Sequence, residues 1–152
     1  MAQMVAFNQL YKEFDEIYHR YAKACGMSDS AFWVLYCVLE REEPYTQKEL
    51  CDTWSYSRQT VNSALKSLER QGIVRLVPEP HDRKSKRIVL TPRGEALAKE
   101  KAAPLFAAER EAFGELRVRE RGEFLRLMEK HVRLLQARTD VLLRSWEERA
   151  GE

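Results

Sequence analysis

Apolar residues recur three and four positions apart near the start of the chain and predict a helix of about five turns. The stripe comprises Phe7, Leu10, Tyr11, Phe14, Ile17, Tyr18 and Tyr21. We expect this helix to end near Gly26, because a glycine commonly follows the last helical turn. Residues 32–39 are apolar on almost every side and predict a second, buried helix with Ser28 as its N-cap.

Two short helices separated by a turn are predicted next, over residues 46–54 and 57–71. Thr46 and Glu49 form a capping box, in which each side chain hydrogen-bonds the backbone N–H of the other residue. Ser57 can cap the second helix, which stops before a glycine. This pair of helices is typical of a helix-turn-helix motif.

The hydrophobic period changes from about 3.6 to about 2 after Gly72, which predicts a β-hairpin over residues 73–91. Both strands are rich in β-branched residues, and the segment 78–82 between them has turn chemistry. Thr91 and Pro92 then begin another helix, with the proline at its first position. The hairpin therefore lies directly behind the helix-turn-helix.

The C-terminal part of the chain is expected to be helical to near Arg149, with breaks around Pro104 and Gly114. Its apolar residues keep a seven-residue rhythm in two series, which are Leu127, Leu134 and Val141, and Met128, Leu135 and Leu142. A helix this long has no obvious partner within a small domain, so pairing with a second chain explains the stripe. The alternative is a contact with the first helix of the same chain.

A chain of 152 residues fits one domain. No run approaches the roughly 20 apolar residues of a membrane span and no secretory leader is evident, so we expect a cytoplasmic protein without a membrane partner. The three cysteines, Cys25, Cys37 and Cys51, form no Cys-x-x-Cys pair. They favour reduced thiols over a disulfide framework or a zinc site.

Charge is distributed unevenly along the chain. Residues 57–93 contain nine basic and three acidic residues, a net charge of +6, which leaves −4 for the rest of the protein. A basic segment in an otherwise acidic molecule is typical of a surface that binds a polyanion. The alternative is a chance cluster of charges on a solvated face.

The helix at 57–71 separates its side chains into two faces. At 100° per residue, Val61, Leu65 and Leu68 define the core side, and no acidic residue occurs from Arg58 to Ser67. Hydrogen-bonding and basic side chains in this arrangement suit the base edges and phosphates of a DNA major groove. The candidate DNA contacts on this helix are Ser57, Arg58, Gln59, Thr60, Asn62, Ser63 and Lys66.

The run DRKSKRIVLTPRG, from Asp82 to Gly94, resembles the wing signature of the MarR-type winged helix-turn-helix regulators. That signature has an aspartate, basic residues, a Leu-Thr pair and a glycine three positions after the threonine, and residues 45–74 resemble the helix-turn-helix of the family. The resemblance implies one MarR-like domain over residues 1–152 with a mainly α fold. Within it, the winged helix-turn-helix lobe would span residues 28–103, and the dimerisation helices residues 1–26 and 104–152.

The resemblance also implies a homodimer on a pseudo-palindromic DNA operator. One recognition helix per protomer would enter successive major grooves, and the wings would reach the adjacent minor grooves. The candidate DNA contacts of the wing are Arg83, Lys84, Lys86 and Arg87, with Asp82 orienting them. The sequence leaves open whether Arg83 or Lys84 enters the minor groove.

Related regulators bind small, often aromatic, molecules where the dimer helices meet the DNA-binding lobe. Tyr18, Tyr21, Trp33 and Tyr36 could line such an effector pocket, although aromatic residues at helical spacing also fit an ordinary core. Some relatives sense peroxide through a cysteine near the N-terminal helix. Cys25 therefore has two interpretations, a redox sensor or an inert thiol.

Catalytic motifs are not evident. His19, His81 and His131 lie on different elements, and no metalloprotease, nucleophile-elbow or phosphate-loop pattern is present, so we expect no enzyme activity, cofactor or metal. We predict a sequence-specific, double-stranded DNA-binding transcriptional regulator, a homodimeric repressor relieved by a small-molecule effector. The alternative is a winged-helix dimer that serves as a protein-interaction or RNA-binding module.

Overall fold

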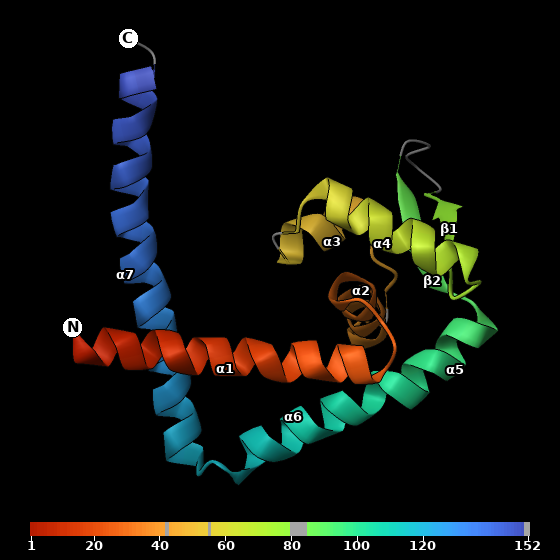
Figure 1. Cartoon of the computed structure of the whole chain (residues 1–152), viewed down its shortest axis with the longest axis horizontal. Helices are drawn as coiled ribbons and strands as arrows, with labels where there is room; N and C mark the ends of the chain where they lie inside the picture. Colours follow the sequence, from red (N-terminus) through yellow and green to blue (C-terminus); the bar gives the residue numbers. More distant parts are fainter. Residues whose placement is uncertain (42, 55, 80–84, 151–152) are drawn as a thin grey trace. The chain divides into compact units, whose positions relative to one another are not determined.

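The computed structural model describes residues 1–41, 43–54, 56–79 and 85–150, which form seven helices and a two-stranded sheet (Figure 1). The elements are α1 (Ala2–Ala24), α2 (Asp29–Glu40), α3 (Gln47–Trp54), α4 (Arg58–Arg70), β1 (Val74–Pro78), β2 (Lys86–Leu90), α5 (Pro92–Lys101), α6 (Ala103–Glu115) and α7 (Val118–Ala150). The chain divides into two compact units, Met1–Ala107 and Ala108–Glu152. The predicted mainly α fold with a hairpin wing is confirmed.

Side-chain caps determine where α2, α3, α4 and α5 begin. Ser28, Ser57 and Thr91 each accept a hydrogen bond from the backbone N–H three residues on, at 3.3, 3.0 and 3.0 Å. The capping box of α3 is formed as predicted. Glu49 Oε2 accepts from the backbone N–H of Thr46 at 2.8 Å, and Thr46 Oγ1 accepts from that of Glu49 at 3.2 Å. The predicted helix-turn-helix is therefore confirmed in α3 and α4.

The core of the first unit forms around α2, which packs against α1, α4, α5 and β2. Phe32 and Leu35 of α2, Leu65 and Leu68 of α4 and Ile88 of β2 are at most 1% exposed. Burial of each such side chain stabilises the fold by about 1.5–3 kcal/mol. The apolar side of α4 is thus held inward, and its polar side is left facing solvent.

The wing hairpin is joined to the segment that leads into α3. β1 and β2 pair antiparallel with Leu76 opposite Ile88. The backbone N–H of Ile88 also donates a 2.7 Å hydrogen bond to the carbonyl of Tyr45, and Thr46 forms an isolated β-bridge with Arg87. The helix-turn-helix and the base of the wing therefore share one hydrogen-bonded backbone network.

The glycine of the wing signature is needed where α5 approaches the start of the hairpin. A Cβ on Gly94 would lie 1.9 Å from the backbone oxygen of Ile73, a distance that no side chain tolerates. The backbone N–H of Thr91 donates a 3.0 Å hydrogen bond to the same oxygen. The threonine and the glycine thus dock α5 closely against the hairpin.

The helix breaks lie slightly outside the predicted positions. They fall at Ala102 and at residues 116–117, whereas the sequence indicated Pro104 and Gly114. Pro104 is the second residue of α6, where a missing backbone N–H removes no helical hydrogen bond. Gly114 lies in the last turn of that helix, which continues for one more residue.

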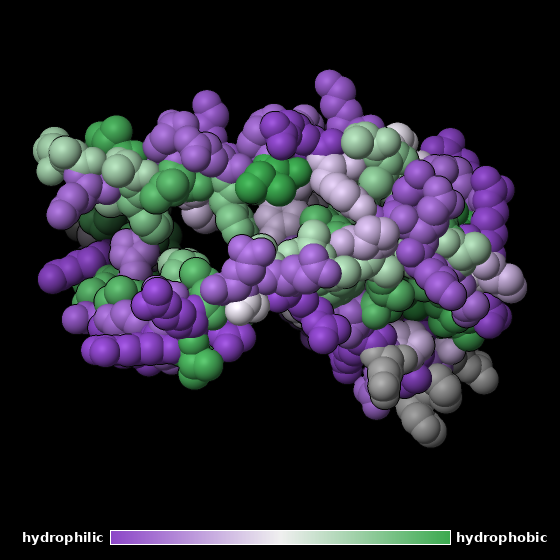
Figure 2. Space-filling model, turned by 90° about the horizontal axis from the view of Figure 1, so that it is seen from below, coloured by the Kyte–Doolittle hydropathy of each residue, from purple (hydrophilic) through white to green (hydrophobic). Residues whose placement is uncertain are grey.

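The long helix α7 has no buried residue although it carries the predicted apolar stripe. The six residues of the two heptad series are each 40–55% exposed. On α1, the exposed apolar residues include Leu10, Tyr11, Phe14 and Ile17. Figure 2 shows such apolar side chains (green) among polar ones on the molecular surface. Both helices therefore present apolar area that a partner surface could cover.

Candidate nucleic-acid interface

The outward side of α4 combines hydrogen-bonding and basic side chains. Gln59, Asn62, Ser63 and Lys66 are exposed, and Thr60 is half-buried. The inward side is buried, and it consists of Val61, Ala64, Leu65 and Leu68. The predicted division of this helix into a polar face and a core face is therefore confirmed.

The first turn of α4 uses one predicted DNA contact as its cap. Ser57 Oγ accepts from the backbone N–H of Thr60 at 3.0 Å, and the two hydroxyl oxygens lie 2.8 Å apart. Arg58, the first helical residue, is exposed. Ser57 thus has a structural role at the helix start, and its contact with DNA stays a prediction.

A groove lies between α3, α4 and the base of the wing. All three elements contribute basic side chains to its lining, with Lys48 from α3, Arg58 and Lys66 from α4, and Lys86 from β2. Of the described residues in this lining, Glu69 is the acidic one. An excess of positive charge in a groove concentrates polyanions such as the DNA backbone.

Two polar residues at the start of α3 line this groove and were not among the predicted DNA contacts. Gln47, the first residue of α3, donates a hydrogen bond of 2.6 Å from Nε2 to Asn62 Oδ1 on α4. Lys48 follows it and is exposed. No spacing rule connects residue 47 with residue 62, since the contact depends on how the two helices pack. The position of Gln47 at the start of a helix-turn-helix was the signal available.

The predicted wing contacts fall into two groups. Asp82, Arg83 and Lys84 lie outside the described residues, so their roles stay predictions. Lys86 and Arg87 both belong to β2, where successive side chains point to opposite faces of the hairpin. Lys86 lines the groove beside α4, and its contact with DNA stays a prediction.

Arg87 forms an ion pair across the hairpin. Its Nε donates a 2.9 Å hydrogen bond to Glu79 Oε1, and Nη2 donates to the same oxygen. This hydrogen bond, and then the charge of the carboxylate, raise the pKa of Arg87. The guanidinium is therefore already paired with an anion before DNA arrives.

The four residues of the predicted effector pocket form a packed aromatic cluster. The ring centroids of Tyr18 and Trp33 are 5.1 Å apart, and those of Trp33 and Tyr36 are 5.0 Å apart. Tyr36 is also stacked on Phe106 with centroids 4.1 Å apart. The hydroxyl of Tyr21 donates to the carbonyl of Lys101 at 3.0 Å. This packing is what an ordinary core requires, and an effector site among these rings stays a prediction.

The surroundings of Cys25 favour the inert thiol over the redox sensor. Cys25 is half-buried at the end of α1. Burial raises the pKa of its thiol, and the nearby Lys101 ammonium lowers it by less. A raised pKa leaves little of the thiolate that reacts with peroxide. Cys37 and Cys51 are buried. For Cys37, this agrees with its place in the segment 32–39, which was expected to form a buried helix.

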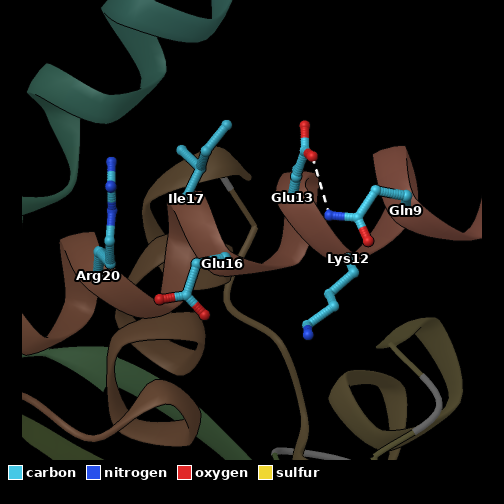
Figure 3. Close-up of a pocket in the computed structure, with 6 residues that line it drawn as sticks. All are labelled: Gln9, Lys12, Glu13, Glu16, Ile17 and Arg20. Carbon is cyan, nitrogen blue, oxygen red and sulfur yellow. Dashed lines mark hydrogen bonds between the residues drawn. The ribbon is translucent and has the colours of Figure 1, made fainter.

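A shallow depression on α1 has a mixed lining and no focused chemistry. Figure 3 shows Glu13 and Ile17 pointing to one side of the helix and Lys12 and Glu16 to the other. Gln9 donates a 3.0 Å hydrogen bond to Glu13 within this face. The charges are those of a solvated helix surface.

The described ranges were also compared with the patterns of metal sites and of membrane-spanning helices. No group of three or more His, Cys, Asp and Glu side chains that could hold a metal ion occurs there. In the same part of the chain, no helix combines the length and the apolar character needed to cross a bilayer.

Several solved structures share this fold. A MarR family regulator from Neisseria meningitidis has a TM-score of 0.76 at 20% identity, with 92% of this chain and 98% of that chain covered. The MepR–DNA complex of S. aureus has a TM-score of 0.69 at 17% identity, covering 86% and 96%. Bordetella bronchiseptica BpsR, whose DNA binding is regulated by 6-hydroxynicotinic acid, has a TM-score of 0.64 at 20% identity, covering 84% and 90%.

Comparison with curated proteins and with family models gave two different results. No curated protein matches the chain. Residues 26–85, which include α2, α3, α4 and β1, match the MarR family. This match and the fold shared with the solved structures confirm the resemblance of the chain to the MarR-type winged helix-turn-helix transcriptional regulators.

Proposed function

We propose that this protein is a sequence-specific, double-stranded DNA-binding transcriptional regulator that inserts α4 into the major groove. The observation that carries the proposal is the exposed face of α4, which has no carboxylate from Arg58 to Ser67 and borders the basic groove. A polar, basic helix face supplies donors and acceptors for base edges, and its flanks supply charges for phosphates. The DNA complex of MepR, which has the same fold, supports this use of the scaffold.

The groove predicts a definite dependence of affinity on salt. Among the described residues of its lining, Lys48, Arg58, Lys66 and Lys86 supply four positive charges, and Glu69 supplies one carboxylate. Each phosphate neutralised by such a charge contributes about −0.9 to the slope of log K against log salt concentration. A dimer that uses four charges per protomer should therefore show a slope of about −7.

The proposed active form is a homodimer on a pseudo-palindromic operator. The two apolar series on α7 are exposed along three heptads, which is the pattern of a helix that pairs with another surface. Two copies related by a two-fold axis would present two α4 helices to successive major grooves. A pseudo-palindromic site mirrors that symmetry.

We further propose that DNA binding represses transcription and that a small aromatic molecule relieves it. Tyr18, Tyr21, Trp33 and Tyr36 supply the aromatic surface for such an effector. The regulation of BpsR by 6-hydroxynicotinic acid supports an aromatic ligand for this scaffold. Titration of 6-hydroxynicotinic acid and related aromatic acids against the protein–DNA complex tests this step, since release at saturating ligand is expected.

The central test compares three nucleic acids. Duplex DNA from upstream of the protein's own gene, unrelated duplex of equal length and structured RNA are titrated at one salt concentration. A preference for the upstream duplex of well over about tenfold is expected, since specific sites exceed non-specific binding by far more than that. Equal binding of all three would instead indicate the protein-interaction or RNA-binding module.

A further inference from the structure

Asn62 lies on the exposed face of α4, and its side-chain oxygen faces α3. That oxygen accepts the 2.6 Å hydrogen bond from Gln47 Nε2. An asparagine with both ends of its amide available suits adenine, because it accepts from adenine N6 and donates to N7. With the oxygen turned toward Gln47, the Nδ2 protons are the groups that Asn62 presents to a base edge.

Gln47 is well placed to hold this orientation. It is the first residue of α3, and the two hydrogen bonds of the capping box fix the backbone on either side of it. Glu49 of that box also pairs with Arg41, with Nη1 3.6 Å from Oε1. Leu50 of α3 is buried in the same core as α4. The distance between the two amides is therefore set by packed helices rather than by flexible segments.

We propose that Gln47 is a positioning residue that makes Asn62 a hydrogen-bond donor toward DNA. The base pair beneath Asn62 is then read for a base whose edge carries an acceptor without an adjacent amine donor, which is guanine with O6 and N7 or thymine with O4. Adenine is disfavoured there, because its N6 donor would lack the asparagine oxygen. DNA binding removes water from the two amides, which strengthens the hydrogen bond between them. This inference rests on the proposed function and states what the operator carries at one position.

The experiment is selection from a randomised duplex library with the full-length protein and four variants. Asn62→Ala identifies the base pair that Asn62 contacts, because the variant should lose the base preference of the wild type at that pair only. Gln47→Ala releases the oxygen of Asn62, and Gln47→Glu supplies a carboxylate that can only accept. Lys48→Ala is the matched control, since it changes the adjacent exposed residue and should weaken all sequences alike. Low salt concentration keeps the Gln47→Glu complex measurable despite its added negative charge.

The wild-type protein should favour guanine or thymine at that pair by about fivefold or more. Gln47→Ala should move the preference to adenine. Gln47→Glu should turn the Asn62 amide around, so that its oxygen faces DNA and selects an exocyclic amine, that of cytosine or adenine. All other positions of the selected sequence should stay as in the wild type. Unchanged thermal unfolding of the variants shows that their fold is intact.

Two results would overturn the role of Gln47 and leave the proposed function standing. One is an unchanged preference at that base pair in both Gln47 variants, and the other is a wild-type preference for adenine. In either case α4 still reads DNA. A wild-type protein that enriches no sequence at all would overturn the proposed function, and the role of Gln47 with it.

Discussion

Replacement of Leu134 and Leu135 by alanine measures how much the exposed stripe of α7 contributes to dimer formation. The two side chains are 55% and 54% exposed in the single chain. Full burial of a leucine is worth about 1.5–3 kcal/mol, so burial of the exposed half contributes about 1 kcal/mol per leucine. Four such leucines per dimer give about 4 kcal/mol, which raises the dimer Kd several hundredfold.

Sedimentation velocity over a wide concentration range gives this Kd directly. Gln136→Ala with Asp140→Ala is the matched control, because both residues are exposed on the opposite side of the same helix. The control should dimerise like the wild type. A stronger variant, Leu134→Asp with Leu135→Asp, should be monomeric by light scattering and should lose operator binding, because an unpaired charge buried in the interface is costly. A Kd of the alanine variant within a few-fold of the wild type would refute the α7 interface.

Three further predictions concern the wing, its docking and pH. Gly94→Ala should lower the free energy of unfolding by at least about 1–3 kcal/mol, because the added methyl group meets the backbone oxygen of Ile73. A urea midpoint equal to that of the wild type would contradict this. Lys86→Ala should reduce the steepness of the salt dependence by about 0.9 per protomer, whereas Arg87→Ala should not, because Glu79, which directly follows β1, already neutralises Arg87. Equal changes in the two variants would argue against the placement of these side chains on opposite faces of the hairpin. His19 has a raised pKa because the carboxylate of Asp29 on α2 accepts its hydrogen bond, so its contribution to stability is complete at acidic pH and is lost as pH rises through that pKa. His19→Gln should remove this part of the pH dependence, and a stability profile identical to that of the wild type would count against the pair.

The sequence predicts the local elements well because their signals lie within a few residues. Thr46 and Glu49 are three positions apart and satisfy each other's backbone groups, whatever the rest of the fold does. The wing signature is likewise local, since Thr91 and Gly94 are three positions apart and together dock α5 against the hairpin. The two faces of α4 follow from helical geometry alone.

Contacts between elements could not be predicted from the spacing of residues along the chain. Whether Arg87 meets DNA or Glu79 depends on strand register, since a slip of one residue would carry its side chain to the other face of the hairpin. The contact of Gln47 with Asn62 depends on the packing of α3 against α4. Periodicity in α7 likewise reveals an apolar stripe but not the surface that covers it.

The hydrogen bond between Tyr45 and Ile88 has a consequence for synthesis on the ribosome. At roughly 5–20 residues per second, the segment leading into α3 waits roughly 2–9 s for its partner strand to be made. During that interval α2, apolar on almost every side, lacks the cover of β2 and α5. A nascent chain stalled before Ile88 therefore exposes the future core of the lobe, and α2 is the segment that a chaperone would bind first.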